Sequence, residues 1–232
     1  MSKHVALMGE LARLVDVCAL MDVSVLEQEL ACNDEHTSQW RELCGKLDSA
    51  RVKGADKLRL GLLYALRYES QGRVPELKQR MQSAGVSSER VALVDALLAY
   101  AGASKRGPGL YGERGLLASM KKGMKTALEG IENVYSQHVP VLMNVLDQAA
   151  KGKLKDAAFP SVGGTSGGGG EKPPDIIVFM VGGVTFEEST KVAEWNATNA
   201  SGVRVLLGGN FVHNSTSFLE EVGEFFGPHA SR

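Results

Sequence analysis

Three features are scarce in this sequence of 232 residues, and each scarcity excludes a class of protein. With only 3 cysteines, it cannot build a disulfide framework, so Cys18, Cys32 and Cys44 are interpreted as reduced thiols of a cytosolic protein. No apolar run approaches the roughly 20 residues that a membrane span requires. The N-terminal 17 residues are interrupted by charges, which predicts an amphipathic helix rather than a signal peptide. Membrane association is therefore expected to be peripheral or through a partner.

An excess of charge of either sign is also missing. Lys and Arg number 26, and Asp and Glu number 27, which gives a formal net charge of -1. Proteins that bind nucleic acid generally present a basic excess on some element, so we expect no nucleic-acid partner. The small basic patch of Lys121, Lys122 and Lys125 is interpreted as a solvated helix face.

Residues 1 to about 158 show the spacing of helices. Apolar side chains recur every three or four positions from the N-terminus, at Val5, Met8, Leu11, Val15 and Cys18. Ser24 and Glu27 have the spacing of a capping box and predict the start of a short helix that ends near Asn33. Residues 55–70 are strongly apolar on one face, which predicts the central helix of a bundle. A further helix is expected to begin at Pro140 and end at Gly152.

Composition changes at residues 159–174, where glycine and proline predict a flexible linker. Residues 175–181 then form a continuous apolar run, which is typical of a strand covered on both faces. Thr185 and Glu188 have capping-box spacing and predict a helix to about Asn199. A second strand over 202–209 and a helix capped by Asn214 or Ser215 follow. Strand, helix and strand in this order predict parallel strands with a right-handed crossover.

Two parallel strands alone seldom make a stable sheet. No third convincing strand is evident in residues 1–158, so we expect the missing strands to come from another chain or from a part of the protein outside this sequence. The hypothesis is that the sequence is truncated or begins at an internal methionine.

Gly182 and Gly183 follow the first strand, where many phosphate-binding sites begin. The dinucleotide pattern Gly-x-Gly-x-x-Gly is incomplete, because the third glycine is missing, and no Lys-Ser/Thr pair follows as in a P-loop. Glu187 and Glu188 place negative charge in the first helical turn, where it would repel phosphate. The favoured interpretation is a sharp turn after a buried strand. An α/β enzyme that binds a nucleotide at Gly182 and Gly183 is the disfavoured alternative.

The spacing of Cys and His residues in the sequence does not indicate a metal or catalytic site. Cys32, His36 and Cys44 do not supply the four ligands of a structural zinc site. His138 precedes a helix start and is expected to hydrogen-bond locally, while His213 lies in a loop without a nucleophile in a strained elbow nearby. We therefore predict no catalytic, cofactor-binding or metal-binding residues, and no cofactor.

Several stretches taken in order resemble the SM family, the Sec/Munc-type syntaxin-binding proteins. They are LEQELACN at 26–33, DKLRLGLLYALRYE at 56–69, GIENVYSQHVPVL at 130–142, GKLKDAAFP at 152–160 and DIIVFMVGGVTFEES at 175–189. Each motif alone is weak, but the ordered set covers nearly the whole chain. The likeness is greatest to the vacuolar sorting branch. Val184, Phe186 and Thr190 depart from that pattern.

The resemblance implies an α-helical domain followed by a small α/β segment of two parallel strands with a crossover helix. In the family this segment completes a larger three-layer α/β domain. Residues 1–158 would then be the C-terminal half of the helical third domain, 159–174 the linker, and 175–232 the C-terminal part of the second domain.

The resemblance also implies a function. SM proteins bind syntaxin-type SNAREs and regulate vesicle docking and membrane fusion without catalysis. The vacuolar sorting branch acts between the Golgi, endosomes and the vacuole, and is held peripherally at those membranes through its partners. The residues that contact SNAREs stay unknown at this point, because the family's main binding surfaces map before Met1 for the most part.

Overall fold

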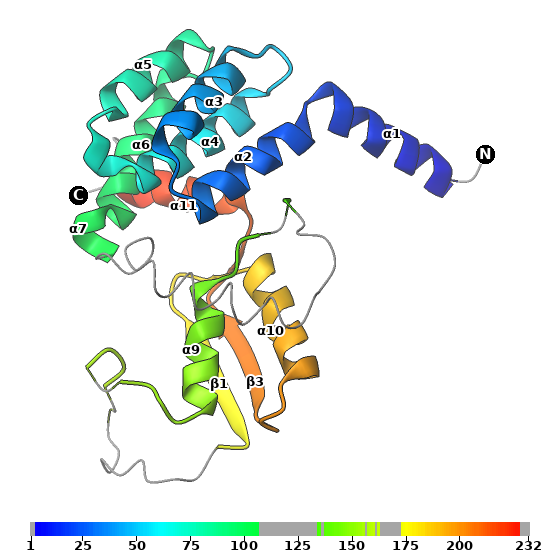
Figure 1. Cartoon of the computed structure of the whole chain (residues 1–232), viewed down its shortest axis with the longest axis vertical. Coiled ribbons are helices and arrows are strands. Elements are labelled where there is room, and N and C mark those ends of the chain that lie inside the picture. Colours follow the sequence, from blue (N-terminus) through cyan, green and yellow to red (C-terminus); the bar gives the residue numbers. More distant parts are fainter. Residues whose placement is uncertain are drawn as a thin grey trace. The chain divides into compact units, whose positions relative to one another are not determined.

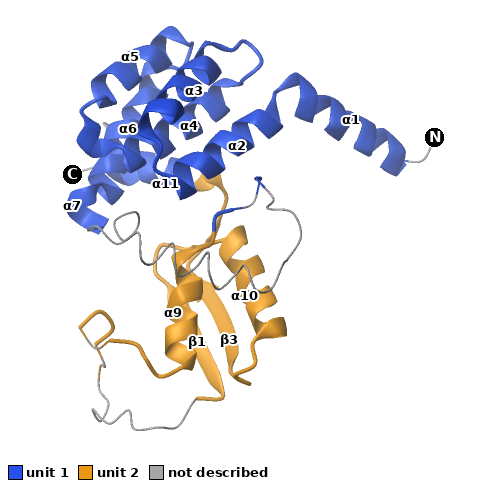
Figure 2. Ribbon diagram, viewed as in Figure 1, with its two compact units in different colours: residues 1–138, 219–232 blue, residues 139–218 orange. Residues whose placement is uncertain are grey.

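The computed structural model describes residues 3–106, 134–135, 137–155, 157–160, 162 and 173–227. The chain divides into two compact units, one of residues 1–138 and 219–232 and the other of residues 139–218 (Figure 2). The predicted patch at Lys121, Lys122 and Lys125 and most of the predicted linker lie outside the described residues.

The first unit is helical. Its elements are α1 (Lys3–Val17), α2 (Leu20–Cys32), α3 (His36–Asp48), α4 (Gly54–Arg67), a 3-10 turn η1 (Glu69–Gln71), α5 (Val74–Ser83), α6 (Ser88–Ala101), α7 (Ala103–Arg106) and the end of α11 (Ser215–Phe226). As predicted, α4 is the central helix, packed against α2, α3, α5 and α6 (Figure 1). Leu58, Leu60, Leu62 and Tyr64 of α4 are all buried. Each buried leucine contributes about 1.5–3 kcal/mol to folding.

The capping box predicted at Ser24 and Glu27 is wrong. Helix α2 begins at Leu20, so Ser24 lies inside it, and no side chain caps its start. Val23, Leu26 and Leu30 share one buried face. This face extends the helix upstream of Ser24, and packing of an apolar face stabilises a helix more than one cap does.

Helices α1 and α2 meet at Ala19, which is a non-glycine residue in the left-handed region, with φ 50° and ψ 38°. That conformation costs an alanine roughly 1–2 kcal/mol. Cys18 and Ala19 are buried, whereas α1 has no buried residue. The apolar face predicted for the N-terminal helix therefore exists. Its end at Val15 and Cys18 is covered, whereas Val5, Met8 and Leu11 stay exposed.

The second unit is α/β and holds α9 (Val141–Ala150), β1 (Asp175–Met180), β2 (Val184–Thr185), α10 (Phe186–Thr198), β3 (Arg204–Gly209), β4 (Val212–His213) and the start of α11. Strands β1 and β3 pair in parallel, from Asp175 opposite Arg204 to Met180 opposite Gly209, which confirms the predicted parallel pair. Figure 1 shows α9 and α10 beside these strands. A core of Leu142, Leu146, Val192 and Val205 joins them.

Coverage of β1 on both faces, as predicted, is not found in the described part of the chain. Exposure alternates along β1, and Ile176 and Val178 point to the α9–α10 core. Ile177 and Phe179 on the other face are 77% and 62% exposed. The apolar run is continuous because both faces are apolar, but only one has a packing partner among the described elements.

The compact units do not follow the predicted domain division at 158 and 175. Helix α9 falls in the predicted helical range, yet its Leu142 and Leu146 pack with the α/β core. Helix α11 falls in the predicted α/β range, yet its residues from Leu219 belong to the helical unit, where Gly223 lies against Leu93. Which domain of a larger protein each range represents stays a prediction.

Candidate functional site

The turn after β1 contains the two glycines at which phosphate binding is the disfavoured alternative. Gly182 and Gly183 have φ values of 97° and 107°, which explains why glycine stands at both positions. The Gly182 amide donates to Asn210 Oδ1 at 3.1 Å. The Gly183 amide donates to the Met180 carbonyl at 3.2 Å. Both glycine amides of the turn are therefore bonded within the protein.

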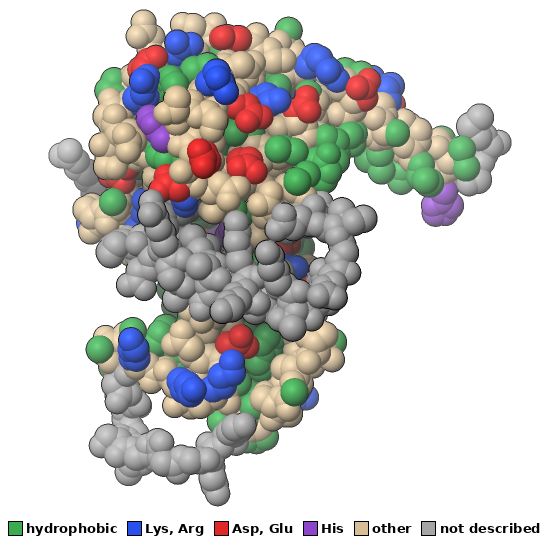
Figure 3. Space-filling model, in the orientation of Figure 1, with side chains coloured by type: hydrophobic (Ala, Val, Ile, Leu, Met, Phe, Trp, Pro, Cys, Tyr) green, Lys and Arg blue, Asp and Glu red, His purple; other side chains and the backbone are tan. Residues whose placement is uncertain are grey.

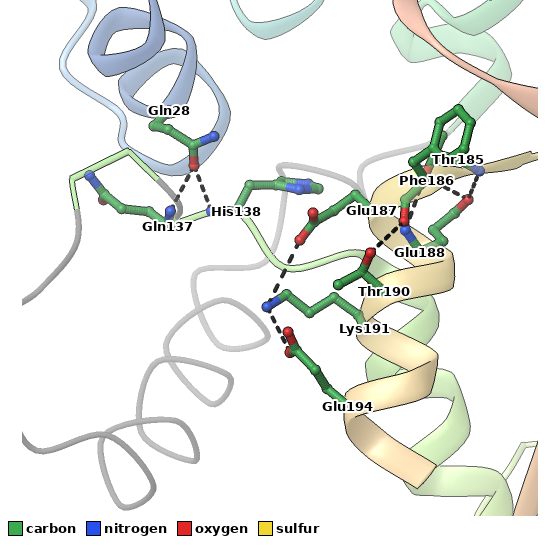
Figure 4. A network of polar contacts seen from close by, with 10 residues as sticks. All are labelled: Gln28, Gln137, His138, Thr185, Phe186, Glu187, Glu188, Thr190, Lys191 and Glu194. Atoms are coloured by element: carbon green, nitrogen blue, oxygen red, sulfur yellow. Dashed lines mark hydrogen bonds and ion pairs between the residues drawn. The ribbon is translucent and has the colours of Figure 1, made fainter. Parts of the chain in front are cut away.

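The start of α10 is closed by side-chain contacts of its own residues (Figure 4). The Thr185 hydroxyl accepts from the Glu188 amide at 3.2 Å, and the Glu188 carboxylate accepts from the Thr185 amide at 2.7 Å. These contacts form the capping box that the sequence predicted. The Glu188 carboxylate already occupies the positive end of the helix dipole. An added phosphate would have to displace this carboxylate, so the geometry does not support a phosphate cradle here.

His213 holds this turn in place. It lies on β4, which pairs with β2 through Val184 opposite Val212 and Thr185 opposite His213. Its buried ring lies 2.9 Å from the Gly182 carbonyl through Nε2 and 3.1 Å from the Ser217 hydroxyl through Nδ1. A carbonyl can only accept, so the ring donates to it through Nε2. The expected loop position of His213 was wrong, because two-residue strands leave no pattern in a sequence.

The other residues considered for metal binding or catalysis lie apart. His36 Nε2 is 2.8 Å from the hydroxyl of Tyr64, and the His36 ring also packs on Tyr68. Burial raises the pKa of the Cys44 thiol, which keeps it protonated and less reactive. Within the described residues, no three His, Cys, Asp or Glu side chains are placed to hold a metal ion.

His138 makes a long-range backbone contact, and its expected local hydrogen bond stays a prediction. Its amide donates to Oε1 of Gln28 on α2 at 2.7 Å, and the Gln137 amide donates to the same oxygen at 2.8 Å (Figure 4). Gln28 therefore ties the segment before α9 to the helical unit. The sequence offered no signal for this contact between residues about 110 positions apart.

Among the described helices, α1 has the longest exposed apolar surface. Val5, Met8 and Leu11 are 55%, 70% and 54% exposed. Together with Leu7 they form what we call the α1 stripe. Figure 3 shows hydrophobic side chains along one side of this helix and charged ones on the other. Glu10 and Arg13 pair on the charged side at 2.6 Å. A bare stripe of this kind is suited to an amphipathic helical partner.

No described helix has both the length and the apolar character needed to cross a bilayer.

Comparison with known proteins places these features in a family. The model of the Sec1 family matches residues 1–221. Vacuolar protein sorting-associated protein 45 of Dictyostelium discoideum is 42% identical over 95% of this chain and 39% of its own length. The Homo sapiens protein of that name is 43% identical over 95% of this chain and 38% of its own length. The chain therefore spans about two fifths of the length of these relatives.

Solved structures agree with these sequence matches. The SM protein Vps45 in complex with the Qa SNARE Tlg2 has a TM-score of 0.82 and 40% identity over 97% of this chain and 40% of its own. The Unc18–syntaxin 1 complex of Monosiga brevicollis has a TM-score of 0.63 over 88% of this chain and 35% of its own, and its 20% identity speaks for the fold alone. The resemblance to SM proteins of the vacuolar sorting branch is thereby confirmed. The chain belongs to the Sec1 family.

Proposed function

We propose that this chain is part of a protein that binds a syntaxin-type SNARE and regulates vesicle docking and fusion between the Golgi, endosomes and the vacuole. The observation that carries the proposal is the likeness, over 97% of the chain, to a Vps45 solved with the Qa SNARE Tlg2. The protein would be cytoplasmic and held peripherally at these membranes through the SNARE. The shared name of the relatives, vacuolar protein sorting-associated protein 45, supports this location.

The proposed role is binding rather than catalysis. The turn at Gly182 and Gly183 has its amides bonded within the protein, and the start of α10 is closed by Thr185 and Glu188. Hydrogen bonds within the protein therefore explain these residues without a bound ligand.

The α1 stripe is the surface that we propose for the SNARE. Its side chains recur every three or four positions, as a helical partner with an apolar face requires. Met8 is 70% exposed, so burying it against such a face would remove apolar area from water. Glu10 and Arg13 neutralise each other beside the stripe, so the surface selects for apolar complementarity more than for charge.

The bare face of the sheet has a different proposed role. Ile177, Phe179 and Leu206 lie on one face, and each is at least 47% exposed. We propose that this face carries the remaining layer of the three-layer α/β domain that the family resemblance implies. The relatives have more than twice the length of this chain, which leaves enough sequence for such a layer.

The proposed function is tested by titrating the purified chain with the cytosolic region of a Tlg2-type Qa SNARE. Met8→Glu and Leu11→Glu place a carboxylate in the stripe and should each weaken binding at least tenfold. Loss of a central buried anchor costs about 2 kcal/mol or more, and tenfold corresponds to about 1.4 kcal/mol. Ala6→Glu adds the same charge to the exposed polar side of α1 and should leave binding unchanged. Equal affinity for all three variants would remove the stripe from the proposal.

A further inference from the structure

The joint between α1 and α2 combines a helix-forming sequence with a bent structure. Alanine is the strongest helix former, yet Ala19 lies in the left-handed region with φ 50°. Apolar side chains also continue through the joint with a spacing of three or four, at Ala12, Val15, Ala19, Val23, Leu26 and Leu30. Local sequence and observed conformation therefore favour different states, a conflict that folded proteins usually avoid.

Arg51 holds the bent state. It follows α3, and its guanidinium donates to the backbone carbonyl of Asp16 and lies 3.1 Å from the Asp16 carboxylate. The Ala19 amide also donates to that carbonyl, at 3.0 Å. In an uninterrupted helix the Asp16 carbonyl would accept from the Leu20 amide four residues on. Arg51 thus satisfies an acceptor that the bend leaves without its regular helical partner.

Two kinds of contact favour the bend, an exposed ion pair and the burial of two residues at the joint. The Arg51 and Asp16 side chains are 55% and 83% exposed, so solvent screens their attraction. Cys18 and Ala19 are buried and favour the bend, whereas α1 has no fully buried residue and only Leu14 and Val15 are half-buried. An open groove of about 290 Å³, lined among others by Ala19, Asp22, Lys46 and Arg51, lies beside the joint.

We propose that Ala19 is a two-state joint. In one state α1 and α2 are bent apart and Arg51 binds Asp16. In the other they form one helix from Lys3 to Cys32, with Arg51 released. The exchange turns the α1 stripe relative to α3 and α4. The stripe as a SNARE surface rests on the proposed function, but the joint itself does not.

The test measures a distance across the joint in the free chain. Spin labels are introduced as encoded amino acids at Ala6 and Arg41, both exposed, and distances are read by double electron–electron resonance. Arg51→Ala should add a second, separate distance whose share grows several-fold over the unmodified chain. Ala19→Gly should shift the ratio about fivefold toward the bent distance, because glycine adopts left-handed conformations readily and weakens a helix.

Arg13→Ala is the matched control, since it removes an exposed arginine on α1 that pairs only within that helix. It should leave the distances unchanged. One unaltered distance in all variants would overturn the two-state joint. A broad distribution in Arg51→Ala, with loss of helical circular dichroism, would overturn it as well, because α1 would then be fraying. No SNARE is present in this experiment. A negative result for the two-state joint therefore leaves the proposed function untouched, and a negative result for SNARE binding leaves the two-state joint untouched.

Discussion

Gly183 lies directly against His213. A Cβ at Gly183 would come within 2.7 Å of the His213 Cδ2 atom and 3.0 Å of Nε2. The same ring bonds the neighbouring Gly182 carbonyl at 2.9 Å. The close approach of backbone to imidazole, rather than a bound phosphate, accounts for the glycine at this turn.

Gly183→Ala should therefore destabilise the second unit more than Gly182→Ala does. Both glycines have positive φ, but a Cβ at Gly182 meets no atom within 4 Å, so that variant reports backbone strain alone. The additional steric cost at Gly183 should be roughly 1–3 kcal/mol, measured by urea unfolding of the two variants. A Cβ at Gly183 also lies 3.0 Å from the Phe211 carbonyl, so equal losses would mean that His213 and this carbonyl both move aside freely.

A titration with nucleotides distinguishes this explanation of the glycines from the phosphate alternative. Calorimetric titration of the chain with ATP, GTP, NAD and NADP should show no saturable heat, because the Gly182 and Thr185 amides are bonded to Asn210 and Glu188. Micromolar binding that is lost in Gly183→Val would revive the nucleotide interpretation.

Thr185→Ala should cost about 1 kcal/mol of stability, since it removes the hydroxyl that accepts from the Glu188 amide. Thr190→Ala is the control, because that hydroxyl only donates to the Phe186 carbonyl one turn back in the same helix. It should change the free energy of unfolding by less than about 0.5 kcal/mol. A reversed order of the two effects, again by urea unfolding, would show that the capping box does not stabilise α10.

A charged side chain should be tolerated on one face of the β1–β3 sheet and should destabilise the unit on the other face. Ile177→Lys changes a side chain that is 77% exposed and should alter stability by less than about 0.5 kcal/mol. Val205→Lys buries an ammonium in a site that is 3% exposed and should unfold the second unit. Circular dichroism melts of both variants check this pair. Strong destabilisation by Ile177→Lys would indicate that its face is covered in solution.

Alkaline pH should weaken the helical unit through Tyr64. Burial raises the pKa of this phenol from 10.0 to about 12. Because the unfolded chain releases the proton more easily, the stability from Tyr64 is fully present below pH 10 and is lost as the pH rises toward about 12. Tyr64→Phe loses the contact with His36, so it should melt lower near neutrality but decline less steeply between these pH values. Parallel declines for both proteins would contradict the assignment.

Features determined by short-range hydrogen bonds could be predicted from the sequence. The Thr185–Glu188 box formed as expected, and Asn214 Oδ1 accepts from the Thr216 and Ser217 amides at 2.9 and 3.0 Å. The same reasoning failed at Ser24, because a spacing of polar residues does not reveal that an apolar face extends a helix upstream of it.

Features that depend on distant contacts could not be predicted. Nothing near Gln28 indicates that its side chain receives the Gln137 and His138 amides. The apolar spacing of α1 was visible, but whether a partner covers that face depends on elements far along the chain or outside it. For the same reason the run at residues 175–181 suggested two covered faces where the structure shows one.

We propose that the α1 stripe binds a SNARE helix, and the affinity of the purified chain for the cytosolic region of a Tlg2-type Qa SNARE tests this most directly. Saturable binding is expected, which Leu11→Glu weakens at least tenfold and Ala6→Glu leaves intact, with all three proteins melting alike. No binding by the unmodified chain, or equal binding by both variants, would contradict the proposal.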